Sequence, residues 1–453
     1  MSGRRPNFVF IFADDWGWGD LGCYGHETLR TPFLDRLAAE GTLFTQFYVC
    51  SGVCSPSRAA AMTGQFPARF GIHGHFATDE LNARRGMPNC LDPSAETFAR
   101  LLQRSGYATG HFGKWHLGKG DDAPEPSAYG IDEHIVNSGN GPQLEFGGGT
   151  GPTFNPRMRH KSSQIIVDHT IDYIRRHQKD PFMVNVWLND THATLAPDEE
   201  QLVPYELLMP DDVKTRWPGA LAIYYAAATN ADRHIGRLLA ALEEMNLTQD
   251  TVVIFSSDNG PEDIHIRNAS HSGVGSPGPF RGRKRSLYEG GVRTPFILRW
   301  PGGGVRSGAI DNTTPLCAVD FLPTFCELAG ADVPSDTPLD GESMAAVFHG
   351  EERARSTPLL WEWRFRIYGH PLNQSPALSV RDGRWKLLFN PERDRVELFD
   401  VAADPMELDN QAREQPDVVD ELAEKGIAFQ AELPEGPKDP EAGSNAYRWP
   451  GTF

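Results

Sequence analysis

The sequence predicts an α/β protein with a large mixed, mostly parallel sheet sandwiched by helices, followed by a small C-terminal antiparallel sheet with a helix. Short, nearly all-apolar runs at 7–12 and 251–257 are typical of strands buried on both faces. Segments with helical periodicity alternate with such runs, which indicates a parallel sheet. Beyond residue 340 the strands are short and lack intervening helices, which favours antiparallel pairing.

The composition limits the class of protein and its partners. The chain has 453 residues, 39% hydrophobic and 23% charged, as in ordinary soluble globular proteins. Residues 332–340 are rich in proline and aspartate, so we expect a large α/β domain at 1–350 and an α+β subdomain packed on it at 351–453. The formal net charge of −18 argues against nucleic acid or an anionic membrane as the main partner. An anionic ligand would therefore need local cations or a metal ion.

The cysteines do not indicate a disulfide scaffold, and the apolar runs do not indicate a membrane span. The six cysteines are scattered and form no CxxC motif, and no apolar run approaches membrane-spanning length. The N-terminal residues lead directly into a strand, without an h-region or cleavage site. The sequence as written therefore indicates a cytoplasmic protein, or a periplasmic or secreted one if a signal has been removed.

Two carboxylates, Asp14 and Asp15, follow the first strand at 7–12. Ligands of open α/β sheets bind at the carboxyl ends of the strands, and adjacent acids repel each other unless a cation lies between them. The alternative is a pair of solvated loop acids. The position after a buried strand favours a hard-cation site.

The segment at 31–41 is predicted as a helix with Thr31 as N-cap, Pro32 in the first turn and Gly41 as its stop. The strand at 42–48 then leads to Cys54.

A loop that leads into a helix is predicted at 54–58, where Cys-Ser-Pro-Ser-Arg is followed by alanines. Pro56 suits the first turn, and Ser55 can cap it. Cys54 would then lie at a helix N-terminus, where partial positive charge favours an anion, and Arg58 points back toward it. The alternative is a buried structural cysteine beside a surface arginine.

The next polar pair follows a helix at 94–105 and a strand at 107–113. Lys114 and His116 are two residues apart, so they share one face of an extended chain; the alternative is plain surface polarity. Residues 120–160 are rich in Gly, Pro and Asn without periodicity, which predicts a long irregular insertion near the site.

The middle of the chain repeats the pattern in which polar residues follow a buried strand. A helix at 163–178 and a strand at 181–188 precede His192, and the longest helical pattern spans 217–246. The strand that starts at Thr251 ends at Asp258 and Asn259. Two strands that each end in a pair of oxygen-bearing side chains can supply four oxygen ligands to one ion. The second pair therefore strengthens the hypothesis of a metal site.

A basic run, Arg281 to Arg285, follows a Gly/Ser/Pro-rich segment at 270–279. A solvated turn is one reading, but the flanking glycines and the strand at 296–300 favour a loop at the site. The C-terminal strands are predicted at 359–363, 385–389 and 397–400, with one polar helix after them.

The motifs together resemble those of the formylglycine-dependent type I sulfatases, members of the alkaline-phosphatase-like superfamily. Cys-Ser-Pro-Ser-Arg matches their CxPxR signature. Further blocks match in the family's order: the opening strand at 7–17, GKWHLG at 113–118, the histidine block at 190–192, SDNG at 257–260, EGGxRxP at 289–295 and the strand and turn at 397–407.

The resemblance implies a role for each matching residue. Cys54 would be converted to formylglycine by a maturation enzyme, and its hydrated aldehyde would be the nucleophile. Calcium would be held by the oxygen ligands Asp14, Asp15, Asp258, Asn259 and residue 54 itself. The catalytic side chains would be Arg58, Lys114, His116, His192 and Lys284.

The implied chemistry is the hydrolysis of a sulfate monoester. Arg58 and Lys114 would polarise the diol, and Lys284 would clamp the sulfate, leaving Arg281, Arg283 and Arg285 at the surface or substrate rim. His192, near Lys284, would protonate the leaving oxygen, and His116 would deprotonate the remaining hydroxyl so that sulfate leaves. The sequence after His192 departs from the family's THxP pattern, which puts the shape of this loop in doubt.

The segments at 72–75 and 88–92 are similar to those of some sulfatases that act on galactose or N-acetylgalactosamine sulfates, including 4-sulfatases. The resemblance therefore implies a sulfated saccharide substrate; the finer expectation is exo cleavage at a 4-O position. His75 and, more weakly, His271 are candidates for substrate contacts; an ordinary loop histidine is the alternative for His75.

Two other functions fit parts of this pattern. One is a phosphate or phosphonate ester hydrolase of the same superfamily, which would hydrolyse phosphate esters faster than sulfates. The other is a non-catalytic, calcium-dependent glycan-binding protein in which Cys54 stays a thiol.

Overall fold

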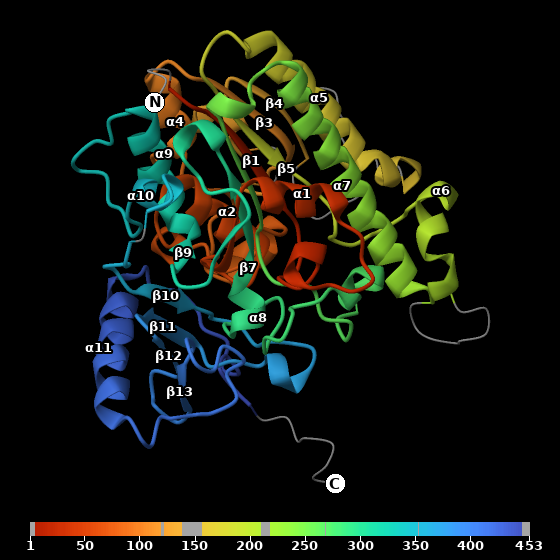
Figure 1. The fold of residues 1–453 in the computed structure, drawn as a ribbon. Coiled ribbons are helices and arrows are strands. Elements are labelled where there is room, and N and C mark those ends of the chain that lie inside the picture. The colour runs from red at the N-terminus through yellow and green to blue at the C-terminus, as the bar shows by residue number, and fades with distance from the viewer. Residues whose placement is uncertain are drawn as a thin grey trace.

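The structure, a computed structural model, describes residues 5–118, 122–137, 156–209, 218–267, 269–351 and 353–445. The described residues form a main sheet of nine strands in the order β4-β3-β5-β1-β6-β7-β2-β8, with β9 paired to β2 (Figure 1). The strands are β1 (Asn7–Ala13), β2 (Thr42–Tyr48), β3 (Ala108–Lys114), β4 (Glu133–Asn137), β5 (Phe182–Trp187), β6 (Thr251–Ser257), β7 (Arg293–Arg299), β8 (Ala309–Asp311) and β9 (Leu316–Cys317).

The main sheet is mixed and mostly parallel, as predicted. Strand β1 pairs in parallel with both β5 and β6, whereas β7 runs antiparallel to β6 and β2. In the register of β1 and β6, Ala13 lies opposite Ser257. The residues after these strands, Asp14 and Asp258, are therefore brought to the same edge of the sheet.

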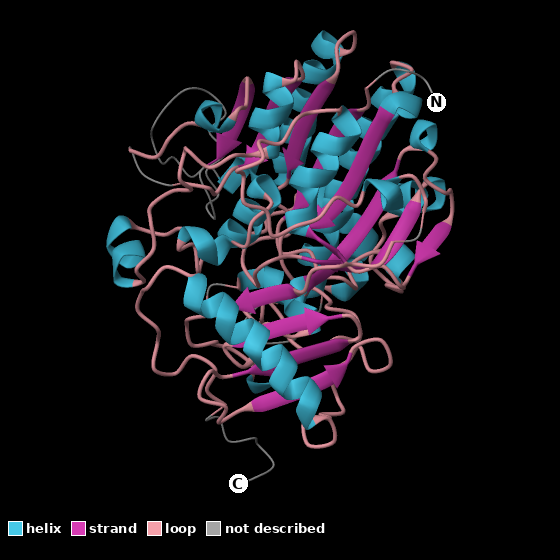
Figure 2. Cartoon of the chain, turned by 90° about the vertical axis from the view of Figure 1, so that its left-hand side faces the viewer, coloured by secondary structure: helices cyan, strands magenta, loops and turns pink. Residues whose placement is uncertain are grey.

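Helices cover both faces of this sheet (Figures 1 and 2). Successive residues of β1 point to opposite faces: Phe8, Phe10 and Phe12 pack in one cluster with α2, α4 and α9, whereas Val9 and Ile11 pack in a second cluster with α1, α5 and α7. The helices are α1 (Pro32–Glu40), α2 (Cys54–Thr63), α3 (Asp79–Arg84), α4 (Phe98–Arg104), α5 (Ser162–His177), α6 (Glu199–Leu202), α7 (Ala220–Glu244), α8 (Glu289–Val292), α9 (Phe321–Ala329), α10 (Ala345–Phe348) and α11 (Pro416–Glu432).

The second sheet is antiparallel and lies below the main sheet in Figure 1. It consists of β10 (Leu359–Glu362), β11 (Leu378–Asp382), β12 (Trp385–Phe389) and β13 (Val396–Asp400) in sequential order. Helix α11 packs across it, as Figure 2 shows. The sequence did not reveal β11, because its five residues follow an irregular stretch.

The segment at 120–160, predicted to be irregular, contains a strand. Within it the structure describes 122–137 and 156–160, and β4 pairs in parallel with β3 at the edge of the main sheet. The prediction was wrong here because a five-residue edge strand with four half-buried residues has too weak an apolar pattern to show. Residues 138–155 lie outside the described residues.

Helix α2 begins two residues earlier than a Ser55 cap would require. It starts at Cys54 with Val53 as N-cap, and Ser55 Oγ accepts the N–H of Phe76 at 3.1 Å. Ser55 therefore fixes the loop at 76 rather than the helix end. Cys54 itself occupies the first turn.

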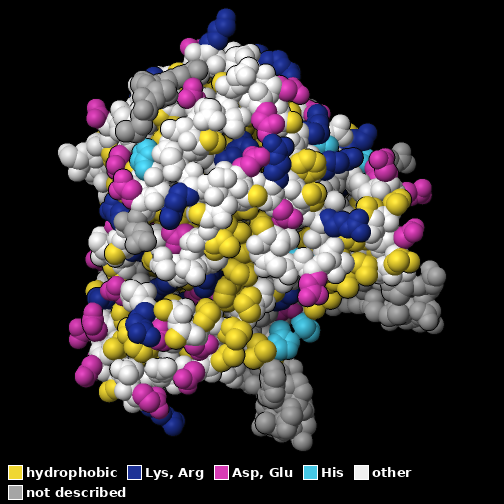
Figure 3. Space-filling view, in the orientation of Figure 1, with side chains coloured by type: hydrophobic (Ala, Val, Ile, Leu, Met, Phe, Trp, Pro, Cys, Tyr) yellow, Lys and Arg dark blue, Asp and Glu magenta, His cyan; other side chains and the backbone are white. Residues whose placement is uncertain are grey.

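The surface agrees with the composition. Figure 3 shows acidic and basic side chains interspersed over one face of the molecule. Within the described ranges, every helix is too short or too polar to cross a membrane.

Gly113 allows strand β3 to pack against β5. Its φ is +110°, and a Cβ at this position would lie 2.0 Å from the carbonyl oxygen of Trp187. Glycine is required both by the conformation and by the close approach of the two backbones.

We expect Gly113→Ala to lower the free energy of unfolding by about 2–4 kcal/mol, because it adds a backbone clash to the cost of a positive φ. Gly330→Ala is the matched control: its φ is +63° with open space around the Cβ position, so we expect a loss of about 1 kcal/mol. Urea unfolding measures both. Equal losses would contradict the clash.

Candidate active site

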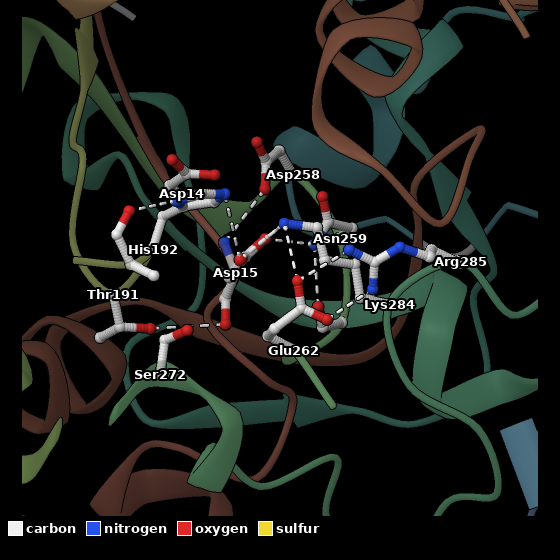
Figure 4. Close-up of polar contacts among 12 residues, drawn as sticks. Asp14, Asp15, Thr191, His192, Asp258, Asn259, Glu262, Ser272, Lys284 and Arg285 are labelled. Carbon is white, nitrogen blue, oxygen red and sulfur yellow. Dashed lines mark hydrogen bonds and ion pairs between the residues drawn. The ribbon is translucent and has the colours of Figure 1, made fainter. Parts of the chain in front are cut away.

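A group of the predicted site residues meets at the carboxyl edge of the main sheet, as Figure 4 shows for Asp14, Asp15, His192, Asp258, Asn259 and Lys284. Asp14 and Asp15 follow β1, and Asp258 and Asn259 follow β6. The Asp258 amide donates to the carbonyl of Ala13 at 3.2 Å, and the Asp15 amide donates to Asp258 Oδ1 at 3.2 Å. The parallel pairing of the two strands thus places the four side chains around one point.

Three buried carboxylates each form their shortest ion pair with a different cation. The pairs are Asp14 with Lys114 at 2.7 Å, Asp15 with Lys284 at 2.6 Å and Asp258 with Arg58 at 2.7 Å. The Arg58 guanidinium also lies 4.9 Å from the centre of the Trp187 ring. A buried charge is tolerated when it is paired and hydrogen-bonded, and the three pairs carry no net charge.

The environment separates the pKa values of these acids. Burial raises the pKa of Asp258 to about 6, helped by the charges of Asp14 and Asp15 and opposed by Arg58. Burial also raises the pKa of Asp15, but the Lys284 ammonium outweighs it and holds this pKa well below its usual range. The pKa of Lys284 is raised in turn, because Asp15 outweighs the effect of its burial. Lys284 is therefore firmly protonated.

Residue 54 lies beside these acids at the start of α2. Cys54 is fully buried, and Asp14, Cys54 and Asp258 can each place one ligand atom within 4.8 Å of the others. Burial raises the pKa of the thiol despite the nearby charges of Lys114 and Lys284. The unmodified thiol is therefore protonated at neutral pH, which disfavours a thiolate nucleophile.

The donor set fits a hard divalent cation. Asp14 Oδ1 and Asn259 Oδ1 are buried and accept no hydrogen bond from any described residue, although such atoms are normally satisfied. Carboxylate and amide oxygens are the ligands that calcium prefers. Asp14, Asp15, Asp258 and Asn259 could therefore hold such an ion.

Two histidines flank the carboxylates. His192 Nε2 lies 3.7 Å from Asp15 Oδ2, while its Nδ1 lies 2.7 Å from the Ala193 carbonyl and donates to it. Burial and the Lys284 charge lower the pKa of His192 to about 3. His116 Nε2 lies 3.2 Å from the Phe76 carbonyl, and burial together with Lys114 holds its pKa well below the usual value. Its Nδ1 is buried without a hydrogen-bond partner in the described chain, so it can accept a proton.

The two histidines predicted to contact substrate differ in position. His75 is half-buried, its ring centre lies 6.5 Å from that of His116, and burial and neighbouring cations, Lys284 among them, lower its pKa to about 3. His75 thus lies beside the site. His271 belongs to a short 3-10 helix, Ser270–Val274, that packs on α7. Its contact with substrate stays a prediction.

The basic loop is more deeply packed than expected of surface residues. Arg283 donates to the carbonyls of Glu262 and Gly275, and Arg285 forms a two-fold ion pair with Glu262 at 2.5 and 2.9 Å. Glu262 Oε2 also lies 3.7 Å from Lys284 Nζ (Figure 4). Glu262 therefore holds Arg285 and Lys284 together. Sequence reasoning missed it, although it follows the SDNG block by two residues.

Arg159 is a second residue that the sequence did not reveal. Its guanidinium donates to the carbonyls of Asn189, His192 and Thr194 at 2.9 Å and pairs with Asp190 at 2.8 Å. The loop that carries His192 is thus held by one buried arginine.

A buried ion network joins the C-terminal sheet to the basic loop. Lys386 on β12 lies 2.8 Å from Glu289 and 3.0 Å from Glu407, and Glu289 also pairs with Arg293 at 3.0 Å. Glu289 begins α8, and the amide of Gly290 donates to the Arg281 carbonyl at 2.7 Å. The network thus anchors the end of the loop that carries Lys284.

This arrangement defines a class of enzyme. Cations directed at one point beside a hard-cation site stabilise the charge of a transferring sulfuryl or phosphoryl group. The site is that of a hydrolase acting on an anionic ester.

Comparison with known proteins identifies the family. The family model described as Sulfatase matches residues 6–331, and the model described as N-sulphoglucosamine sulphohydrolase, C-terminal, matches residues 280–431. The chain belongs to the sulfatase family and is a sulfuric ester hydrolase. Members of this family are generally formylglycine-dependent and metal-binding.

Individual relatives agree with this assignment. Arylsulfatase A of Homo sapiens is 31% identical over 403 residues, covering 85% of this chain and 75% of its own length. N-acetylgalactosamine-6-sulfatase of Sus scrofa is 33% identical over 371 residues, covering 77% and 67%. The crystal structure of Ps i-CgsB superimposes with a TM-score of 0.77 at 25% identity, covering 98% of this chain and 97% of the other. The fold is thus the alkaline-phosphatase-like fold of sulfatases.

Proposed function

We propose that this sulfatase removes sulfate from a carbohydrate, in exo fashion, from galactose or N-acetylgalactosamine. The observation that supports hydrolysis at residue 54 is the convergence of Arg58, Lys114 and Lys284 on the three carboxylates around it. The name of the N-acetylgalactosamine-6-sulfatase relative supports the sugar. A 4-O position remains a prediction from sequence.

Residue 54 is proposed to act as formylglycine, formed by a separate maturation enzyme. Its hydrated aldehyde supplies an oxygen nucleophile for sulfur and a second hydroxyl whose deprotonation releases the sulfate. Calcium, when bound by Asp14, Asp15, Asp258, Asn259 and residue 54, supplies positive charge that favours the ionised oxygen and attracts a sulfate oxygen.

The charged side chains are proposed to position the reacting groups. Arg58 and Lys114 are buried, and they place two positive charges beside residue 54. Lys284 stays protonated and binds a sulfate oxygen. These charges stabilise the transferring sulfuryl group more than the free ester.

Two histidines are proposed to move the protons. His116 is neutral with a buried, unoccupied Nδ1, so it accepts the proton of the second hydroxyl. Burial and the Lys284 charge keep His192 neutral, and the negative charge of a bound ester would raise its pKa. His192, beside Lys284, then protonates the sugar oxygen as the S–O bond breaks.

The central test is sulfate release from a panel of defined galactose and N-acetylgalactosamine sulfates, including 4-O and 6-O isomers. We expect Cys54→Ala to abolish release while keeping the wild-type circular dichroism spectrum, because the nucleophile is lost. Cys23→Ala, which removes a half-buried cysteine outside the site, is the control and should retain activity. Near-wild-type release by Cys54→Ala would exclude residue 54 as the nucleophile, and faster cleavage of phosphate esters would contradict sulfate monoesters as the preferred substrates.

The metal site is tested by calcium content. We expect Asp258→Asn to lower bound calcium and sulfate release together, because one ligand charge is lost. Asp232→Asn is the matched control, since Asp232 is a buried carboxylate that accepts the amides of Phe33 and Leu34. Mass spectrometric metal analysis after dialysis gives the readout. Unchanged calcium in Asp258→Asn would count against a shared site.

The role of His192 is tested through the leaving group. We expect His192→Gln to slow release from a sugar sulfate by about 10²–10⁴-fold, but to affect an aryl sulfate with an acidic phenol far less, because that leaving group needs no proton. His26→Gln, a half-buried histidine on another loop, is the control. An equal loss on both substrates would move the acid role to another residue.

A further inference from the structure

A cavity of about 700 Å³ opens where the C-terminal sheet meets the edge of the main sheet, near β9 and β10 in Figure 1. Its wall includes Gln46 of β2, the loop between β8 and β9, and Arg381 of β11. Strand β2 is the third strand from β1 in the sheet order, about 14 Å away at the usual strand spacing. The cavity is thus separate from the active site, and its volume is that of a small-ligand site.

Four arginines line this cavity in a protein of net charge −18. Three of them are neutralised by carboxylates: the pairs are Arg353 with Glu342 at 3.0 Å, Arg355 with Asp320 at 2.6 Å, and Arg384 with Asp400. The one carboxylate in the wall, Asp382, is itself paired with Lys425 at 2.7 Å. These charges therefore nearly cancel.

Arg381 is the exception. Arg381 is 5% exposed. It makes no ion pair with any carboxylate that the structure describes, although its charge, together with those of Lys386 and Arg293, lowers the pKa of the buried Glu289. One nitrogen donates to the Gln46 side chain, and the guanidinium lies 4.6 Å from the centre of the Tyr48 ring. Its Nε and Nη1 are buried and donate no hydrogen bond within the described chain. Arginine stays charged in proteins, and an unpaired buried charge is costly.

The rest of the wall suits a ligand rich in hydroxyl groups. Asn312, Thr313 and Thr357 line the cavity together with Gln46, and their amides and hydroxyls can both donate and accept. A guanidinium prefers sulfate or carboxylate oxygens, which it can bind through two parallel hydrogen bonds. The volume exceeds the needs of a bare inorganic anion.

We propose that this cavity is an accessory binding site for an anionic saccharide unit, with Arg381 pairing its sulfate or carboxylate group. The inference rests on the proposed function, since it gives a sulfated polysaccharide a second point of attachment. Binding there raises the local concentration of substrate chains at the active site.

The test is calorimetric titration of the Cys54→Ala protein with a monosulfated, galactose-containing tetrasaccharide. We expect two sites per chain, and loss of one in Arg381→Met, because a charge-assisted hydrogen bond is worth on the order of 10- to 100-fold in affinity. Ala354→Trp fills the cavity from an exposed wall position and should have the same effect. The Ala354→Trp variant therefore still tests the cavity if Arg381→Met fails to fold.

Arg36→Met is the matched control, because Arg36 is an exposed arginine paired with Glu40 and Glu243 outside the cavity. Unchanged stoichiometry and affinity in both cavity variants would overturn the proposal. Equally tight binding of inorganic sulfate would overturn its saccharide part. Sulfate release by the protein with intact Cys54 is measured in parallel. The absence of release would contradict the proposed function. Even then, a second binding site that is lost in Arg381→Met and Ala354→Trp would support the accessory site.

Discussion

The pairing of three buried carboxylates with three cations is the interaction on which this structure depends. Asp14, Asp15 and Asp258 come from two adjacent parallel strands, whereas their partners come from α2, the end of β3 and the basic loop. A buried charge that loses its partner costs several kcal/mol. Each element that supplies a charge is therefore required by the others, and the carboxyl edge of the sheet is assembled as one unit.

This balance also gives the site its chemistry. Three negative and three positive side chains cancel, so an added divalent ion creates an excess of positive charge in a buried place. A sulfate monoester carries one negative charge, and its transferring group needs positive charge around its oxygens. With such an ion bound, the site would attract an anionic ester locally, although the protein as a whole is strongly acidic.

The second sheet contributes to the same arrangement from a distance. Lys386 lies between Glu289 and Glu407, and Glu289 begins the short helix that ends the basic loop. The position of Lys284 is thus fixed on one side by Asp15 and Glu262 and on the other by the C-terminal sheet. The same contact between the two sheets borders the cavity that contains Arg381, so this junction bears on both the proposed role of Lys284 and the proposed saccharide binding.

The sequence by itself determined the α/β class, the mixed sheet, the family and the motif residues of the site. These are local signals: an apolar strand followed by acids, a cysteine at a helix start, a basic loop between glycines. Only the tertiary structure decided which carboxylate pairs with which cation, that Glu262 and Arg159 hold the loops of Lys284 and His192, and that Arg283 is packed inward. Such contacts join residues tens to hundreds of positions apart, and no periodicity or composition encodes a partner at that separation. Strands β4 and β11 were missed for a related reason, since a short strand is stabilised by its neighbours in the sheet more than by its own pattern.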